Sequence, residues 1–168
     1  MRTSILFTFL FLLSTLVINA QNFEVPADLP TNKEEFVKSE KDLIAASKWL
    51  ENTAIGTDME KRQDVNAWVL AWIINSPTVT IEVYSSFVKL FDKNPHLNAV
   101  WMAGYARYVL ENSYSTDKVK AHTEGLKAVI NCYNLGGDLK KDKALNKIIE
   151  ANKEGKLEDW VIEAVKAK

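Results

Sequence analysis

The chain has 168 residues, with 21 basic against 22 acidic side chains and a formal net charge of −1. This length fits one domain with its own core, and the balanced charge argues against a nucleic-acid or anionic-membrane surface, which would need concentrated positive charge. Cys132 is the single cysteine, so no intramolecular disulfide can form and packing must hold the fold together.

The first twenty residues have the pattern of a secretory signal peptide. Arg2 precedes an apolar run from Ile5 to Ile18, and Ala20 offers a small residue for cleavage. The run is shorter than the roughly 20 residues that a membrane-spanning helix needs. We therefore expect residues 1–20 to be removed, leaving an exported protein, periplasmic or secreted, without a membrane span. An uncleaved anchor is the alternative.

An extended lead-in and then a helical domain are predicted after the leader. Residues 21–31 carry two prolines in a polar context, which favours an extended segment. Helix signals dominate residues 32–168. Thr31 and Glu34 have the spacing of a capping box, which predicts a helix that begins there and ends near Asn52.

The same spacing recurs at Thr57 and Glu60, and it predicts a second helix that ends before Pro77. Residues 67–74 of this helix, AWVLAWII, are apolar on every side. A helix of this kind is buried, because no face of it suits water.

Residues 78–83, TVTIEV, alternate β-branched side chains as a strand would. No second segment has a convincing strand pattern, and a lone strand leaves its backbone groups unsatisfied. Pro77 suits a first helical turn, and Val83 and Phe87 continue at helical spacing. We therefore predict a helix over residues 77–92.

Asn94 followed by Pro95 predicts the start of the next helix, which runs to about Asn112.

Ser115 or Thr116 is expected to cap the helix after that, which runs to Asn134. Gly136 and Gly137 then stop it, because glycine adopts the left-handed conformation readily.

A helix over residues 139–152, stopped near Gly155, and a last helix with Leu157 and Trp160 on one face complete the pattern. The fold class is therefore all-α, with about seven helices in one domain. Short connections imply antiparallel neighbours stacked as helical hairpins. The three predicted hairpins are residues 58–92, 95–134 and 139–168.

Trp101 and Tyr108 have the spacing of the Trp and Tyr in the first helix of tetratricopeptide repeats, W-x2-L-G-x2-Y. Gly104 stands one position earlier than the glycine of that pattern, and Tyr105 occupies the glycine position. The chain thus resembles tetratricopeptide-like proteins over roughly one hairpin. The resemblance implies stacked hairpins and peptide binding.

Trp101, Tyr105 and Tyr108 fall in one sector of their predicted helix, together with Leu97. Such a stripe indicates core packing, and the alternative is a pocket for a flat apolar or sugar-like ligand. The expected walls of that pocket are Trp68, Trp72, Trp101, Tyr105 and Tyr108.

His122 lies on an apolar stripe, where desolvation would favour its neutral form. One interpretation is a core histidine. In the other, His122 meets Arg107 and Tyr108 across the hairpin and the three side chains bind an anion or a carboxylate. Glu111, one turn after Arg107, is a simpler partner for that arginine.

Cys132 and His96 lie at similar levels of the same hairpin, which raises the hypothesis of a cysteine nucleophile. The alternative is a small buried thiol. The sequence has no H-E-x-x-H motif and no phosphate-binding glycine loop, so we expect neither a metal nor a cofactor.

Together these features predict an exported, non-enzymatic binding or interaction module of the cell envelope or periplasm, with a protein or peptide partner and no nucleic acid. A small-molecule binder with an aromatic pocket is the first alternative. A small hydrolase that uses His122 with Arg107, or Cys132 with His96, is the second. The oligomeric state stays open.

Overall fold

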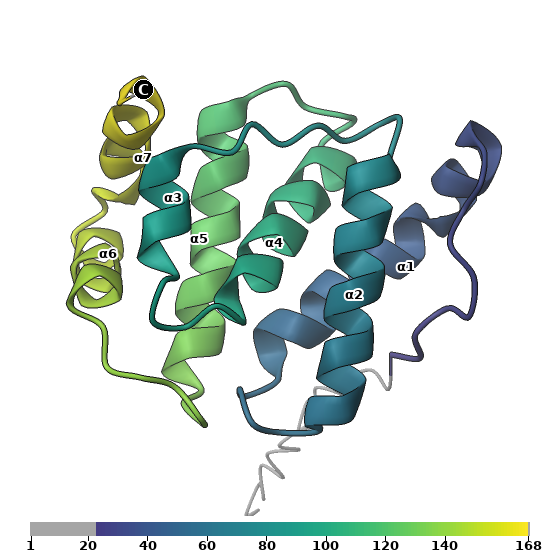
Figure 1. The fold of residues 1–168 in the computed structure, drawn as a ribbon. Coiled ribbons are helices and arrows are strands. Elements are labelled where there is room, and N and C mark those ends of the chain that lie inside the picture. Colours follow the sequence, from purple (N-terminus) through teal and green to yellow (C-terminus); the bar gives the residue numbers. More distant parts are fainter. Residues whose placement is uncertain (1–22, 168) are drawn as a thin grey trace, which may run out of the picture.

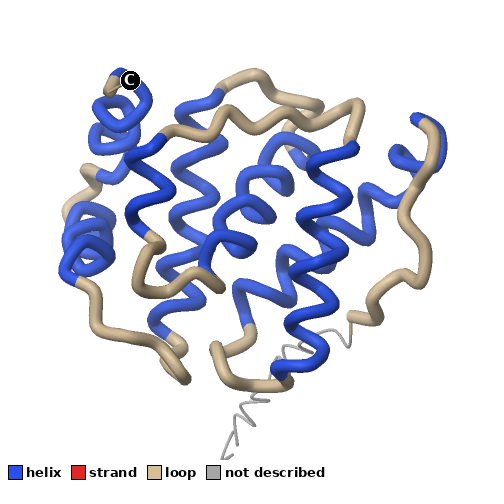
Figure 2. Tube along the Cα trace, viewed as in Figure 1, coloured by secondary structure: helices blue, strands red, loops and turns tan. Residues whose placement is uncertain are grey.

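The structure is a computed structural model that describes residues 23–167, so the predicted signal peptide lies outside the described residues. Within that range the chain is all-helical, as predicted, with seven helices in one domain and no strand (Figure 2). None of these helices is long and apolar enough to cross a bilayer. The helices are α1 (Lys33–Asn52), α2 (Met59–Asn75), α3 (Ser85–Leu90), α4 (Leu97–Glu111), α5 (Lys118–Asn134), α6 (Lys143–Lys153) and α7 (Leu157–Lys166).

The antiparallel pair α4 and α5 forms the centre of the domain (Figure 1). On one side α1 and α2 pack against α4, and on the other α6 and α7 pack against α5. The predicted pairs over residues 95–134 and 139–168 are therefore formed by α4 with α5 and α6 with α7. The predicted hairpin over residues 58–92 is wrong, because α2 packs on α1 and α4, whereas α3 packs on α7.

The predicted helix over residues 77–92 is wrong in its first half. Residues 78–84 have no helical assignment, and the helix is confined to Ser85–Leu90. Ser76 Oγ accepts hydrogen bonds from the amides of Thr78 and Val79, each at 3.2 Å, so the turn after α2 does not continue into a helix. The β-branched side chains that follow also favour extended backbone over helix.

The capping box of α1 is shifted by one residue from the prediction. Asn32 is the N-cap, and its side chain accepts a hydrogen bond of 3.1 Å from the Glu35 amide. The Glu35 carboxylate in turn accepts a 2.7 Å hydrogen bond from the Thr31 amide. Glu34 instead pairs with Lys38 on the surface, at 3.2 Å. Asn32 and Glu35 have the same spacing as Thr31 and Glu34, so spacing alone did not choose the register.

The caps predicted for two further helices are also wrong. Asp58, not Thr57, precedes α2, with a positive φ of 47° and no capping hydrogen bond from its side chain. Asp117 caps α5 by accepting a 3.0 Å hydrogen bond from the Lys120 amide. Ser115 instead accepts a hydrogen bond from the Asp117 amide.

Asn94 does not cap α4 with its side chain. Its amide group makes a pair of hydrogen bonds to the backbone of Lys140, 2.8 and 2.9 Å long, and so ties the start of α4 to the segment before α6. The helix begins three residues later, at Leu97.

The predicted glycine stops are confirmed. Gly136 and Gly137 follow α5 with φ of 77° and 95°, and Gly155 follows α6 with φ of 72°. Gly137 also lies against Ile55, where an added Cβ would come within 1.8 Å of the Ile55 carbonyl oxygen.

Small residues allow α4 and α5 to approach closely. A Cβ added at Gly104 would lie 2.8 Å from the Ala128 Cβ, and one added at Gly125 would lie 2.6 Å from the Trp101 carbonyl oxygen. Trp101 itself is buried in this contact. The centre of the domain therefore has no room for additional atoms.

Candidate functional site

The structure divides the predicted aromatic wall into two groups. Trp68 and Trp72 belong to α2 and face the N-terminal side of the domain. Trp72 donates a 2.7 Å hydrogen bond to Ser39 Oγ and meets the Phe36 ring edge-on at 5.4 Å. Trp68 lies 6.4 Å from the ring of Phe23. Both tryptophans are buried in the core.

Trp101 and Tyr105 form the second group, and His122 lies with them. The His122 ring stacks on Phe87 at 4.3 Å and lies 5.6 Å from Trp101 and 4.8 Å from Tyr105. Tyr108 is only half-buried, at the edge of the core. The five aromatic residues expected to line one pocket thus lie in separate parts of the core, and Tyr105 alone of the five lines either of the two hollows described below.

Arg107 pairs with α1 and not with His122. Its guanidinium lies 2.5 Å from the Glu51 carboxylate, and both side chains are mostly buried, at 15% and 13% exposed. Glu111, the partner expected from the sequence, lies farther away, at 4.0 Å. The predicted meeting of Arg107, His122 and Tyr108 is not formed, and Arg107 instead links α4 to α1.

His122 is fully buried, and neither ring nitrogen makes a hydrogen bond of ordinary geometry to another described residue. Burial lowers the pKa of His122 to about 4, against the opposing influence of the Glu82 charge and backbone. The ring is therefore neutral at ordinary pH and part of the aromatic core.

Cys132 is buried beside Arg62, and its Sγ lies 3.7 Å from the Thr53 carbonyl oxygen. Burial raises the pKa of the thiol, although the neighbouring guanidinium opposes that shift. His96 lies on the exposed surface at the start of α4. Burial and a raised pKa both disfavour the thiolate, which is the reactive form of cysteine.

Arg62 is a buried cation whose partners are carbonyl groups at the end of α1. It donates hydrogen bonds to the carbonyl oxygens of Thr53 at 2.5 Å and Leu50 at 3.5 Å. The negative end of the helix dipole favours a cation at this position. Arg62 thus has a structural role that the sequence analysis did not identify.

The segment over residues 78–83, which has no regular secondary structure, is called here the strip. In Figure 1 the strip crosses from α2 to α3 at the end of the domain where α4 connects to α5. No amide over residues 80–83 donates a hydrogen bond to another described residue. The alternating pattern was visible in the sequence, but the strip has no partner strand within residues 23–167.

Side chains of the strip face two hollows. Thr78, Thr80 and Glu82 line the polar hollow, which has a volume of about 200 Å³. Val79, Ile81 and Val83 line the apolar hollow, which has a volume of about 350 Å³. The remaining residues of the polar hollow are Tyr105, Val109, Tyr114, Ser115, Thr116 and Lys118, and those of the apolar hollow are Ile73, Ile74, Ser76, Thr80 and Met102.

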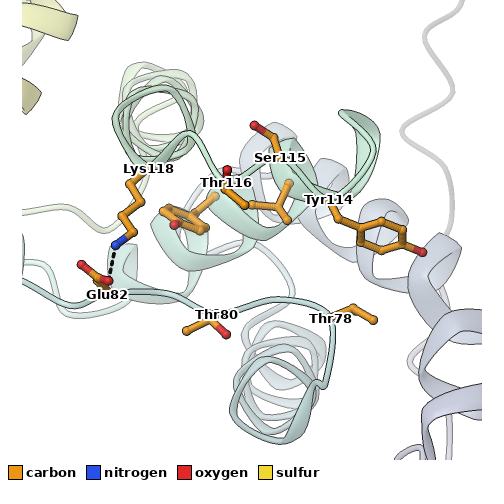
Figure 3. Close-up of a pocket in the computed structure, with 9 residues that line it drawn as sticks. Thr78, Thr80, Glu82, Tyr114, Ser115, Thr116 and Lys118 are labelled. Atoms are coloured by element: carbon orange, nitrogen blue, oxygen red, sulfur yellow. Dashed lines mark hydrogen bonds and ion pairs between the residues drawn. The ribbon is translucent and has the colours of Figure 1, made fainter.

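Figure 3 shows the polar hollow between the strip on one side and residues 114–118 on the other. At one end the Lys118 ammonium group donates a hydrogen bond to the Glu82 carboxylate. Tyr114 lies at the opposite end, and its hydroxyl donates a 3.1 Å hydrogen bond to Glu40. The hydrogen bond with Lys118 is the main cause that lowers the pKa of Glu82.

Within residues 23–167, no group of three His, Cys, Asp or Glu side chains could hold a metal ion. Comparison with models of known families, with curated proteins and with solved structures finds no match to this chain.

Proposed function

We propose that this chain is an exported, non-enzymatic binding module of the cell envelope or periplasm. Its partner is a protein that presents an extended peptide to the strip. The secretory pattern of residues 1–20 supports export. The observation that carries the binding proposal is the extended backbone over residues 80–83, whose amides donate no hydrogen bond to another described residue.

Backbone N–H and C=O groups need hydrogen-bond partners. An extended peptide that lies alongside the strip supplies them as an added strand would, and this main-chain pairing is a recurrent mode of peptide recognition. Because the strip is not part of a sheet, a partner does not have to displace a neighbouring strand.

The apolar hollow supplies the side-chain part of the interaction. Ile74 and Val83 are 76% and 55% exposed at its rim, although both are large and apolar. Exposed apolar groups that cluster around a hollow are typical of interaction sites. We therefore assign to the partner an extended segment with apolar side chains at alternate positions, one of which fills the hollow.

The surroundings of the titratable side chains favour binding over catalysis. His122 is neutral and enclosed by aromatic rings, and Cys132 has a raised pKa. The tetratricopeptide-like spacing of Trp101 and Tyr108 also agrees with a peptide ligand, as an analogy only.

Selection from a displayed library of random 12-residue peptides tests the proposal, with the exported protein as bait. We expect enrichment of peptides with alternating apolar residues, and their affinity should fall at least tenfold in Ile74→Glu and Val83→Glu. Leu135→Glu is the matched control, because Leu135 is 47% exposed but lines neither hollow. Failure to enrich any peptide, or equal affinity in all three variants, would contradict the proposal.

A further inference from the structure

The polar hollow on the other side of the strip has the chemistry of a separate small-molecule site. We propose that it binds a neutral, polyhydroxylated ligand of the saccharide type. The reasons are a hydroxyl group without a described partner on a largely buried tyrosine, a charge-neutral ion pair, and walls rich in hydroxyl groups within a volume of about 200 Å³.

Tyr105 supplies the unpartnered hydroxyl. The residue is 3% exposed and lines the hollow, yet its hydroxyl makes no hydrogen bond to another described residue. The hydroxyl is open to the hollow, where a ligand hydroxyl can donate to it or accept from it. Burial raises the pKa of Tyr105 to about 12, so the group is a neutral donor and acceptor at ordinary pH.

Lys118 and Glu82 determine the charge of the ligand. Their side chains bond to each other, and Glu82 also accepts a 2.6 Å hydrogen bond from the Tyr84 hydroxyl. An anion would have to displace Glu82 from Lys118, and a cation would have to displace Lys118 from Glu82. A ligand hydroxyl can instead donate to the carboxylate and accept from the ammonium group without separating them.

The remaining walls also favour hydroxyl groups. Thr80 and Thr116 are exposed in the hollow and make no side-chain hydrogen bonds to described residues, so each can donate and accept. Tyr114 is 46% exposed and offers an aromatic face at the end of the hollow. Carbon-bound hydrogens on one face of a sugar ring can pack against such a surface.

The backbone of this wall is strained. Ser113 and Tyr114 are consecutive non-glycine residues in the left-handed region, with φ of 54° and 59°. Such conformations are strained for residues with a Cβ and concentrate at ligand-binding segments. Tyr114 lines the hollow, and its hydroxyl donates a 3.1 Å hydrogen bond to Glu40.

Calorimetric titration of the exported protein with glucose, N-acetylglucosamine and sorbitol tests the site, with acetate and phosphate as anionic probes and methylammonium as the cationic probe. We expect saturable binding of at least one neutral probe and weaker or no binding of the charged ones. Tyr105→Phe and Lys118→Met should reduce the affinity at least tenfold. Tyr133→Phe and Lys127→Met are matched controls outside the hollow and should not change it.

The result is separable from that of the peptide selection, because Val83→Glu alters the apolar hollow and should leave saccharide binding unchanged. Three results would overturn the inference: no saturation by any neutral probe, a charged probe that binds as tightly, or equal affinity in Tyr105→Phe and Lys118→Met. Circular dichroism of each variant confirms that it is folded.

Discussion

The contact between α4 and α5 is closely packed, whereas the strip beside it is partly exposed and pairs with no described strand. At Gly125 an added Cβ would lie 2.6 Å from the backbone of α4, so the contact is closed to additional atoms. At Val83, by contrast, 55% of the residue faces solvent and the neighbouring amides have no described partner. The first region holds the domain together, and the second can accept a partner without disturbing it.

The largest effect is expected at the closed contact. Gly125→Val should lower the free energy of unfolding by about 4 kcal/mol, because the new side chain forces α4 and α5 apart. Lys127→Val, on the exposed side of the same helix, should cost less than about 1 kcal/mol. Urea denaturation measures both values, and similar losses would show that the contact is less closed than the geometry indicates.

The buried histidine gives the closed region a pH dependence. The pKa of His122 is about 4 in the fold against an ordinary value of 6.5, so the unfolded chain binds more protons between these limits. Stability from His122 is therefore fully present above pH 6.5 and is lost as the pH falls to 4, by about 3 kcal/mol in total.

His122→Phe tests this assignment, because it keeps an aromatic ring in the stack and removes the titration. Chemical denaturation at several pH values should give a flatter profile from pH 6.5 to 4 than that of the wild type. His96→Gln, at the exposed histidine, is the control. An unchanged slope in His122→Phe would assign the acid sensitivity to other groups.

The same contrast between interior and surface applies to ion pairs, for which smaller energies are expected. A double-mutant cycle at Arg107 and Glu51, whose side chains are mostly buried, should give a coupling of about 1–2 kcal/mol. The exposed pair of Lys153 and Glu150 should give less than about 0.5 kcal/mol. Equal couplings would remove the distinction between the interior link and the surface pair.

The smallest effect is expected beside the polar hollow. Ser113→Gly should raise the free energy of unfolding by up to about 1 kcal/mol, because glycine adopts its positive φ without a Cβ clash. Ser115→Gly, at a residue without a positive φ, should lower it slightly. Thermal denaturation resolves the two signs, and a loss in both variants would show that Ser113 is not strained.

Helix number and most C-terminal helix ends could be predicted because several local signals agreed there. At the end of α5, for example, the apolar pattern stops and Gly136 and Gly137 both favour the left-handed conformation. The start of α1 was harder, since Thr31 and Asn32 each begin a valid capping box. Which of these two residues caps the helix depends on the local backbone geometry, which the spacing in the sequence does not specify.

The backbone conformation of the strip could not be predicted from the sequence, because it depends on packing against the rest of the domain. Its alternation indicated a strand, but the absence of a partner strand argued for helix instead. In the fold, Val79 is buried, with 2% of the residue exposed, and its amide donates a hydrogen bond to Ser76 Oγ. The burial of Val79 and the turn at Ser76 thus keep the strip extended, although it pairs with no described strand.

The candidate site shows the same limit. A helical stripe shows that Trp101 and Tyr105 share a face, but it does not identify the neighbours of that face. The neighbours are His122 from α5 and Phe87 from α3. Because residues 77–92 were predicted to form one helix, the sequence did not indicate the separate position of α3. The polar hollow, which the extended strip lines, therefore could not be predicted.

Amide hydrogen exchange over residues 80–83, with and without a library-selected peptide, tests the central claim most directly. We expect fast exchange in the free protein, because these amides have no described partner. At a peptide concentration 100 times its dissociation constant, exchange of the amides that pair with the peptide should slow by about 100-fold. Unchanged exchange over the strip, with protection gained at another segment, would contradict the proposal that the strip receives the partner.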